Sequence, residues 1–314
     1  MKIIFSGTPE FALPSLEAIL ASPHDVIAVY TQPDRPQGRG LKIAASPIKQ
    51  LAQTHNLSVY QPKTLRDKNI TRPLRDLAPD IFIDVAYGLY IPEEILTLPR
   101  YGCINVHPSL LPRWRGASPI QAAILAGDKT TGISIIKLQQ KLDAGDILKQ
   151  REIPITDQDT TLSLSSKLAK LSADLLLETI TAIETNEAHG IVQDDALSTH
   201  SSKINKEDAQ INWNSSAQQL ERIIRAYNPW PVAYTIIDGQ TVRLWEAEVL
   251  TLTTSAAPGT IIAASKNGID VATKDGILRL IKLQLPGKKV LTANEILNGH
   301  AQLFAIGKHI TTIK

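Results

Sequence analysis

An asparagine and a histidine stand two residues apart, as Asn105 and His107, and Pro108 follows at once. Alternate side chains of a β-strand share a face, so Cys103, Asn105 and His107 are predicted to point to one side. A carboxamide can donate to a developing oxyanion, and an imidazole can take or give a proton near neutral pH. The pair predicts a polarising, proton-transferring site at a strand end. The competing interpretation is a structural role, which is the commoner one for an isolated Asn-x-His.

An imidazole that moves protons needs a third group to orient it, and Asp143 is the candidate. It lies in the segment Leu-Asp-Ala-Gly-Asp, 142–146, just after another strand-like stretch. Other chemistries find less support. Cys103 lies in an apolar stretch that favours a buried, inert thiol. Gly-x-Ser-x-Gly, His-x-x-x-His and paired cysteines are absent from the sequence, so neither a serine hydrolase nor a metal site is expected.

The elements that must position these residues alternate along the first 150 residues. Short, apolar, partly β-branched segments predict buried strands, and helical segments lie between several of them. This alternation predicts an α/β fold with an open, mostly parallel sheet covered by helices. Ligands of such sheets bind beyond the carboxyl ends of the strands. The predicted strands are 2–6, 26–31, 80–86, 102–107 and 132–138, and the predicted helices are 11–21, 46–55, 119–127 and 162–183.

Five further strand-like segments follow residue 230, after one predicted helix at 216–227. Asp-Gly and Asn-Gly pairs separate several of them, as hairpin turns would. This pattern predicts a small C-terminal barrel or sandwich. The expected organisation is a catalytic domain at 1–187, a linker at 188–207 and the C-terminal domain at 208–314.

Composition predicts a folded chain rather than a disordered or membrane-spanning one. Of the 314 residues, 43% are hydrophobic and 20% are charged. No apolar run approaches the roughly 20 residues needed to cross a bilayer. The single cysteine excludes an internal disulfide and fits a reducing compartment. A cytoplasmic protein is expected.

Positive charge gathers in two parts of the chain. Residues 31–75 hold 9 Lys and Arg against 2 Asp and Glu, and residues 201–314 hold 13 against 9. One interpretation is a solvated basic surface. The other is a patch that binds phosphates or nucleic acid.

The motifs together resemble those of the folate-dependent formyltransferases. The resemblance rests first on Asn-Val-His-Pro-Ser-Leu-Leu-Pro at 105–112 and on the segment 142–146. One departure is Lys141, where glycine is common. Further matching segments are 5–11, 31–36 with 38–40, 85–88, 109–116, 203–208 and 228–231.

The resemblance implies a fold, a reaction and roles for individual residues. The implied fold is a Rossmann-like, mostly parallel sheet with helices on both faces, followed by a linker and a smaller C-terminal OB-like β-barrel. The implied formyl donor is 10-formyltetrahydrofolate, and the implied acceptor is the amino group of initiator methionyl-tRNA. The family's catalytic residues fall on Asn105, His107 and Asp143. Its folate-binding loop falls on Ser109, Leu110, Leu111 and Pro112, and the basic residues expected to hold tRNA are Arg35, Arg39 and Lys42.

Two other functions remain open from the sequence. A related enzyme could formylate a small amine, such as an amino sugar nucleotide, and the basic segments favour tRNA over that acceptor. A non-catalytic RNA-binding module is the second alternative, and the Asn105, His107 and Asp143 set argues against it, since binding alone does not require those three side chains. The expected assembly is a monomer.

Overall fold

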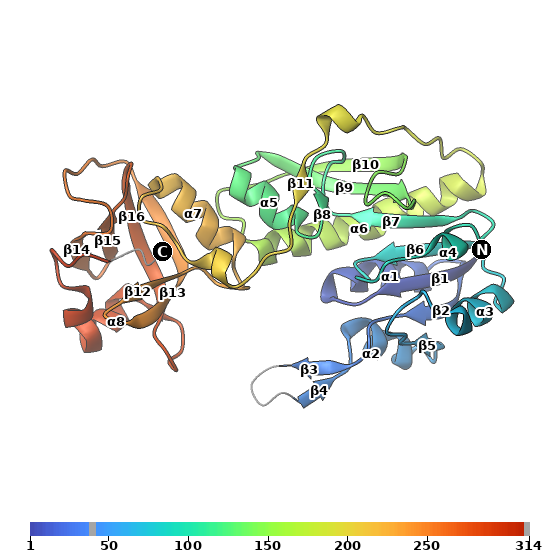
Figure 1. The fold of residues 1–314 in the computed structure, drawn as a ribbon, viewed down its shortest axis with the longest axis horizontal. Helices are drawn as coiled ribbons and strands as arrows, with labels where there is room; N and C mark the ends of the chain where they lie inside the picture. The colour runs from blue at the N-terminus through green and yellow to red at the C-terminus, as the bar shows by residue number, and fades with distance from the viewer. Residues whose placement is uncertain (38–41, 311–314) are drawn as a thin grey trace. The chain divides into compact units, whose positions relative to one another are not determined.

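The computed structural model describes residues 1–37 and 42–310, and its first compact unit contains a seven-stranded sheet (Figure 1). This unit comprises Met1–Pro119, Thr130–Pro154 and Ser165–Ser201. The strand order is β10-β9-β7-β6-β1-β2-β5. The strands of this sheet are β1 (Lys2–Gly7), β2 (Asp25–Tyr30), β5 (Val59–Tyr60), β6 (Ile81–Val85), β7 (Cys103–His107), β9 (Thr130–Lys137) and β10 (Ile147–Pro154).

The sheet is mostly parallel, which confirms the predicted fold class. Strands β7, β6, β1, β2 and β5 run parallel to one another, and β9 and β10 add an antiparallel edge. The carboxyl ends of β1, β2, β6 and β7 therefore meet along one edge of the sheet. This is the edge at which an open α/β sheet binds ligands.

Helices cover both faces of the sheet. On one face, Ile4 and Phe82 pack with Leu74 and Ile95 in one buried cluster. The alternate strand residues, such as Phe5, point to the opposite face and are equally buried. The helical elements of the first unit are η1 (Glu10–Ala12), α1 (Leu13–Leu20), α2 (Pro47–Thr54), α3 (Lys68–Asp76), α4 (Glu93–Leu96), most of α6 (Thr161–Glu184) and η2 (Asp195–Leu197).

The segment 188–201 packs on the first unit. Ile191 and Ile147 exchange two backbone hydrogen bonds of 2.8 and 2.9 Å. Strand β11 (His200–Ser201) pairs in parallel with β8 (Arg115–Gly116). The sequence predicted a linker over 188–207, because polar residues predominate there. The domain limits at 187 and 207 remain a prediction, to which the structure adds this attachment.

The second unit is an antiparallel sheet with helices. It comprises Ile120–Lys129, Ile155–Leu164 and the described chain from Ser202 onward. The order is β12-β13-β16-β15-β14, with β17 paired to β16. Its elements include α5 (Pro119–Ala126, less its first residue), η3 (Glu207–Ala209), α7 (Ala217–Ala226), β12 (Tyr234–Ile237), β13 (Gln240–Leu250), β14 (Ile261–Ser265), β15 (Gly268–Ala272), β16 (Ile277–Gln284), β17 (Leu291–Thr292), α8 (Ala293–His300) and η4 (Ala301–Phe304).

Local sequence signals explain how this unit is built. Asp238 and Gly239 have φ angles of 49° and 75°, as the two-residue turn joining β12 to β13 requires. The Ser216 side chain caps α7 by accepting from the Gln219 N–H at 3.2 Å. Leu220 and Ile224 of that helix belong to the buried core of the sheet. The five strands predicted after residue 230 are all present.

Several short elements escaped prediction. Strand β10 is an edge strand with charged residues along it, and α3 contains Pro73 inside its span. The β3 (Arg35–Gln37) and β4 (Lys42–Ala44) hairpin lies between the predicted strand 26–31 and the predicted helix 46–55. Of the helices in the described ranges, none combines the length and apolar character that a membrane span needs.

Candidate functional site

Asn105 and His107 lie at the carboxyl end of β7, as predicted. Strand β6 flanks them in parallel and β9 in the antiparallel direction. Asn105 is 8% exposed and His107 is 4% exposed. Within the described chain, the Asn105 carboxamide has no hydrogen-bonding partner. Its N–H donors are therefore available to an oxygen atom of a ligand.

The two nitrogens of His107 have different surroundings. Nε2 lies 2.9 Å from the backbone oxygen of Trp114. A carbonyl oxygen only accepts, so this contact assigns the hydrogen of a neutral ring to Nε2. Nδ1 lies 3.7 Å from Oδ1 of Asp143, which is beyond hydrogen-bonding distance but close enough for an ion pair. Nδ1 is therefore the atom that can gain or lose a proton, and it faces a carboxylate when it does.

A hydrogen bond from the backbone holds the side chain of Asp143 in place. Its Oδ2 accepts a hydrogen bond of 2.8 Å from the N–H of Gly116. The residue has a φ of 48°, in the left-handed region that non-glycine residues seldom adopt. Gly145 lets the same turn approach β9, because a Cβ there would lie 1.7 Å from the backbone oxygen of Lys137.

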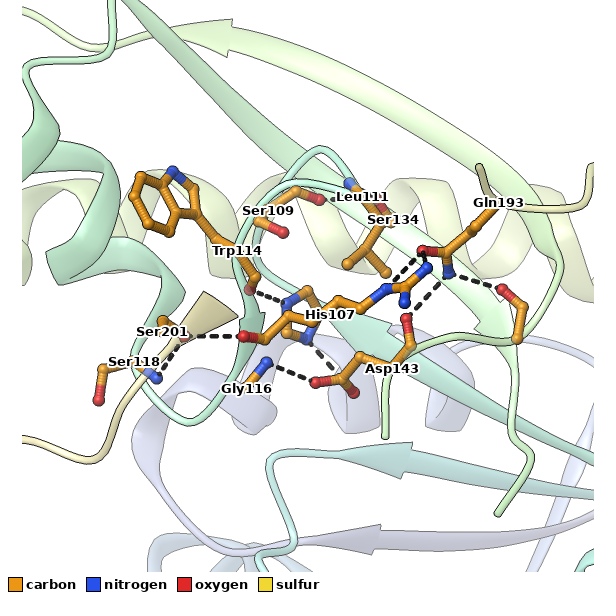
Figure 2. Close-up of polar contacts among 12 residues, drawn as sticks. His107, Ser109, Leu111, Trp114, Gly116, Ser118, Ser134, Asp143, Gln193 and Ser201 are labelled. Carbon is orange, nitrogen blue, oxygen red and sulfur yellow. Dashed lines mark hydrogen bonds and ion pairs between the residues drawn. The ribbon is translucent and has the colours of Figure 1, made fainter. Parts of the chain in front are cut away.

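The backbone around Asp143 is fixed by Gln193 (Figure 2). The Gln193 carboxamide donates to the backbone oxygens of Asp143 and Gly145 at 2.9 and 2.7 Å. Its Oε1 accepts from Nε and Nη2 of Arg115 at 3.0 and 2.8 Å. Arg115 is 1% exposed. Both N–H donors and both acceptor positions of the Gln193 carboxamide are used, so the orientation of this side chain is fixed.

Lys141, the departure from the family pattern, takes part in the outer layer of this arrangement. Its Nζ pairs with Oδ2 of Asp195, whose Oδ1 accepts from Nη1 of Arg115 at 2.7 Å. The hydrogen bond from Lys141 has the largest part in lowering the pKa of Asp195, and the hydrogen bond from Arg115 lowers it further. Because Asp195 is 61% exposed, the pair adds little stability by itself. The lysine connects the Asp143 turn to the segment 188–201.

Comparison with known proteins relates most of the chain to one family. Residues 1–180 match the family described as formyl transferase, and residues 203–301 match the formyl transferase C-terminal domain. A protein of Methylococcus capsulatus named methionyl-tRNA formyltransferase is 50% identical over 301 residues, which is 96% of this chain and 97% of that protein.

The chain belongs to the formyl transferase family.

Solved structures share the fold of this formyl transferase. HypX from Aquifex aeolicus matches with a TM-score of 0.66 at 17% identity, over 98% of this chain and 48% of that one. An N-formyltransferase from Helicobacter canadensis matches with a TM-score of 0.66 at 18% identity, over 89% of this chain and 99% of that one. At these identities the likeness supports the fold alone.

The loop assigned to folate directly follows β7, beside Asn105 and His107. Ser134 of β9 fixes it, because its Oγ donates to the Ser109 backbone oxygen at 2.6 Å and accepts from the Leu111 N–H at 3.0 Å. The side chains of Ser109 and Leu111 are buried, and those of Leu110 and Pro112 are half-buried. Leu110 and Pro112 are therefore the more accessible side chains of this loop.

Two of the residues assigned to tRNA, Arg35 and Lys42, lie in the paired strands β3 and β4. Arg35 is exposed on β3 and pairs with Ala44 of β4. Arg39 lies outside the described residues, and only the backbone of Lys42 is described. The hairpin begins beside Asp34, which accepts from Lys49 at 2.6 Å and from Gln61 at 2.7 Å. These hydrogen bonds lower the pKa of Asp34. No contact in the described chain joins Arg35 to His107.

Two functional candidates of this formyl transferase escaped the sequence analysis. Gln193 lies in the predicted linker, and only its contacts reveal its relation to Asp143. Asp84 of β6 lies beside Asn105 in the sheet. Burial of its carboxyl raises its pKa to about 7, and the nearby charge of Asp143 adds to that rise. A polar residue inside an otherwise apolar predicted strand was the available signal for Asp84.

Replacing Gln193 by glutamate should lower turnover by about 100-fold, because a small displacement of a catalytic group has an effect of this order. Glutamate has the same shape and can still accept from Arg115, but it has no N–H to donate to the backbone oxygens of Asp143 and Gly145. The measurement is kcat together with the ¹⁵N shift of His107 Nδ1. Gln139→Glu, on the exposed turn nearby, is the charge control. An unchanged Nδ1 shift with normal kcat would remove Gln193 from the site.

Proposed function

We propose that the protein transfers a formyl group from 10-formyltetrahydrofolate to the amino group of initiator methionyl-tRNA. The observation that carries this proposal is the 50% identity to a methionyl-tRNA formyltransferase over nearly the full length of both chains. Both family regions are present, so the C-terminal part of such an enzyme is included. The proposed location is the cytoplasm and the proposed assembly a monomer.

The site residues support a direct transfer. The amine forms a bond to the formyl carbon, which becomes tetrahedral with a negatively charged oxygen. In our proposal, Asn105 donates an N–H to this oxygen, as its free carboxamide allows. The bond from carbon to the donor nitrogen then breaks, and that nitrogen takes a proton.

His107 is the proposed carrier of protons between the two nitrogens. Its Nδ1 is the available atom, because Nε2 is engaged by Trp114. When Nδ1 is protonated, Asp143 at 3.7 Å stabilises the imidazolium. In the same proposal, the loop Ser109–Pro112 holds the folate and Gln193 positions Asp143.

A product assay tests the proposed function. The protein is incubated with 10-formyltetrahydrofolate and either charged initiator tRNA, free methionine or a dTDP-linked amino sugar. Formylmethionyl-tRNA should form, and the two small amines should react far more slowly. His107→Ala serves as the inactive control. Rapid formylation of the amino sugar with none on tRNA would overturn the choice of acceptor while leaving the reaction type intact.

Arg35 and Arg39 are proposed to contact tRNA phosphates, with help from Lys42 and the C-terminal domain. Each phosphate contact releases counterions, so Arg35→Ala or Arg39→Ala should reduce the salt slope of tRNA binding by about 1. Arg100→Ala is a matched control, because Arg100 precedes β7 at the opposite edge of the sheet. Binding of a folate analogue should be unaffected. Equal salt slopes in all four proteins would contradict this role for the hairpin.

A further inference from the structure

Asp84 occupies the middle of a polar row that crosses three parallel strands. It pairs with Ser6 of β1 on one side and with Asn105 of β7 on the other. Residues in register on parallel strands point to the same face of a sheet, and neighbouring strands lie about 4.8 Å apart. The Asp84 carboxyl therefore lies one strand away from the carboxamide that is proposed to receive the oxyanion.

Among the residues that the structure describes, hydrogen bonds reach only one oxygen of this carboxyl. Oδ1 accepts from the Ser6 hydroxyl at 2.9 Å and from the Tyr87 N–H at 3.3 Å. Oδ2 has no hydrogen-bond donor in the parts of the chain that are described. The second oxygen is therefore not engaged by Ser6 or by the turn after β6.

The ionisable groups that face Asp84 are Asp143, Tyr87 and Cys103. Burial raises the pKa of the Tyr87 hydroxyl and of the Cys103 thiol far above neutrality, so both remain uncharged there. Burial also raises the pKa of Asp84 to about 7, against the hydrogen bonds from Ser6 and Tyr87. An α-amino group has a pKa near 8 in peptides, so the two groups can exchange a proton with little free-energy change.

We propose that Asp84 receives the acceptor's amino group and takes the proton that its ammonium form must lose before attack. The inference rests on the proposed function, since it requires an amine acceptor. The ammonium nitrogen gives one proton to Oδ2, leaving a neutral amine and a carboxylic acid. The amine then bonds to the formyl carbon, and the proton it releases passes to the departing donor nitrogen. Asp84 returns its own proton to solvent after product leaves.

Asp84→Asn separates this role from a structural one. Asparagine keeps the shape but cannot take the proton, so the variant depends on the roughly 3% of the amine that is already neutral at pH 6.5, and its turnover should fall by up to about 30-fold. At pH 8.5 the loss should be much smaller, because most of the amine is already neutral. Ser6→Ala removes a hydrogen bond that lowers the Asp84 pKa. Its acid limb should therefore move to higher pH, with the maximal rate retained.

Thermal stability is a second measurement, because Asp84→Asn should lower turnover but raise the melting temperature. A carboxyl whose pKa is higher in the folded state contributes stability below its unfolded pKa of about 4, which is lost as pH rises through about 7. Asp84→Asn lacks this loss, so its melting temperature should exceed the wild-type value at pH 8 and not at pH 4. Lower activity with higher stability is the expected combination.

The two proposals fail in distinguishable ways. If the wild type does not formylate charged initiator tRNA, the proposed function is wrong. If it does, yet Asp84→Asn keeps its rate at pH 6.5, the role of Asp84 is wrong. A uniform loss of rate at every pH with a lower melting temperature would also overturn it, in favour of a structural acid. A ¹³C titration of the Asp84 carboxyl that centres near pH 4 would overturn it without any assay.

Discussion

His107→Ala should lower turnover by about 100- to 10,000-fold, the range expected for a positioned acid–base group. His107→Gln is the sharper variant. Glutamine can place an N–H where Nε2 now donates to Trp114, so that contact is kept and only the Nδ1 atom is removed. Both variants should lose a similar share of kcat.

Single-turnover kinetics with a melting curve for each variant would make the measurement. The alanine variant leaves the Trp114 oxygen without its donor, at about 1–3 kcal/mol, so it should melt earlier than the glutamine variant. If His107→Gln keeps most of its turnover while His107→Ala does not, the imidazole acts through shape and not through proton transfer.

Asn105→Ala should lower kcat by about 100- to 1000-fold, as the loss of one oxyanion donor does elsewhere. Because the Asn105 carboxamide has no protein partner in the described chain, removing it breaks no hydrogen bond, and the melting temperature should change little. Asn105→Asp should be at least as slow, since a carboxylate repels the developing negative charge. It also lies beside Asp84, so it should melt earlier at neutral pH.

Folate-analogue binding is the control for both Asn105 variants. If Asn105→Ala weakens that binding in proportion to its loss of kcat, the residue contributes to binding in the ground state and not to the transition state. A kcat within a few-fold of wild type would exclude it as an oxyanion donor.

The sheet and the three proposed catalytic residues were within reach of the sequence because each leaves a local signal. Strands that are buried on both faces are short apolar runs, and β1, β2, β6, β7 and β9 all have that form. Period-two alternation alone placed Asn105 and His107 on one face. The position of Asp143 after a predicted strand made it the candidate third group, and the family resemblance supported that assignment.

The contacts around this trio were beyond prediction because they join distant parts of the chain. Gln193 is 50 residues from Asp143, and nothing in a polar stretch distinguishes a buried glutamine from a solvated one. Asp84 appears in the sequence as one acid in an apolar strand, and its neighbours depend on strand order. The β3–β4 hairpin is too short for periodicity to reveal.

The attachment of the segment 188–201 has a consequence for exchanging parts between related enzymes. A chimera joined after residue 187, just beyond the end of α6, would take Gln193 and β11 from the other parent enzyme. The backbone oxygens of Asp143 and Gly145 would then lose the N–H donors of Gln193. The buried Arg115 guanidinium would lose the Gln193 side-chain oxygen. A chimera joined beyond Ser201 keeps these contacts within one parent. The first compact unit is therefore discontinuous in sequence, and its last segment follows the long helix α6.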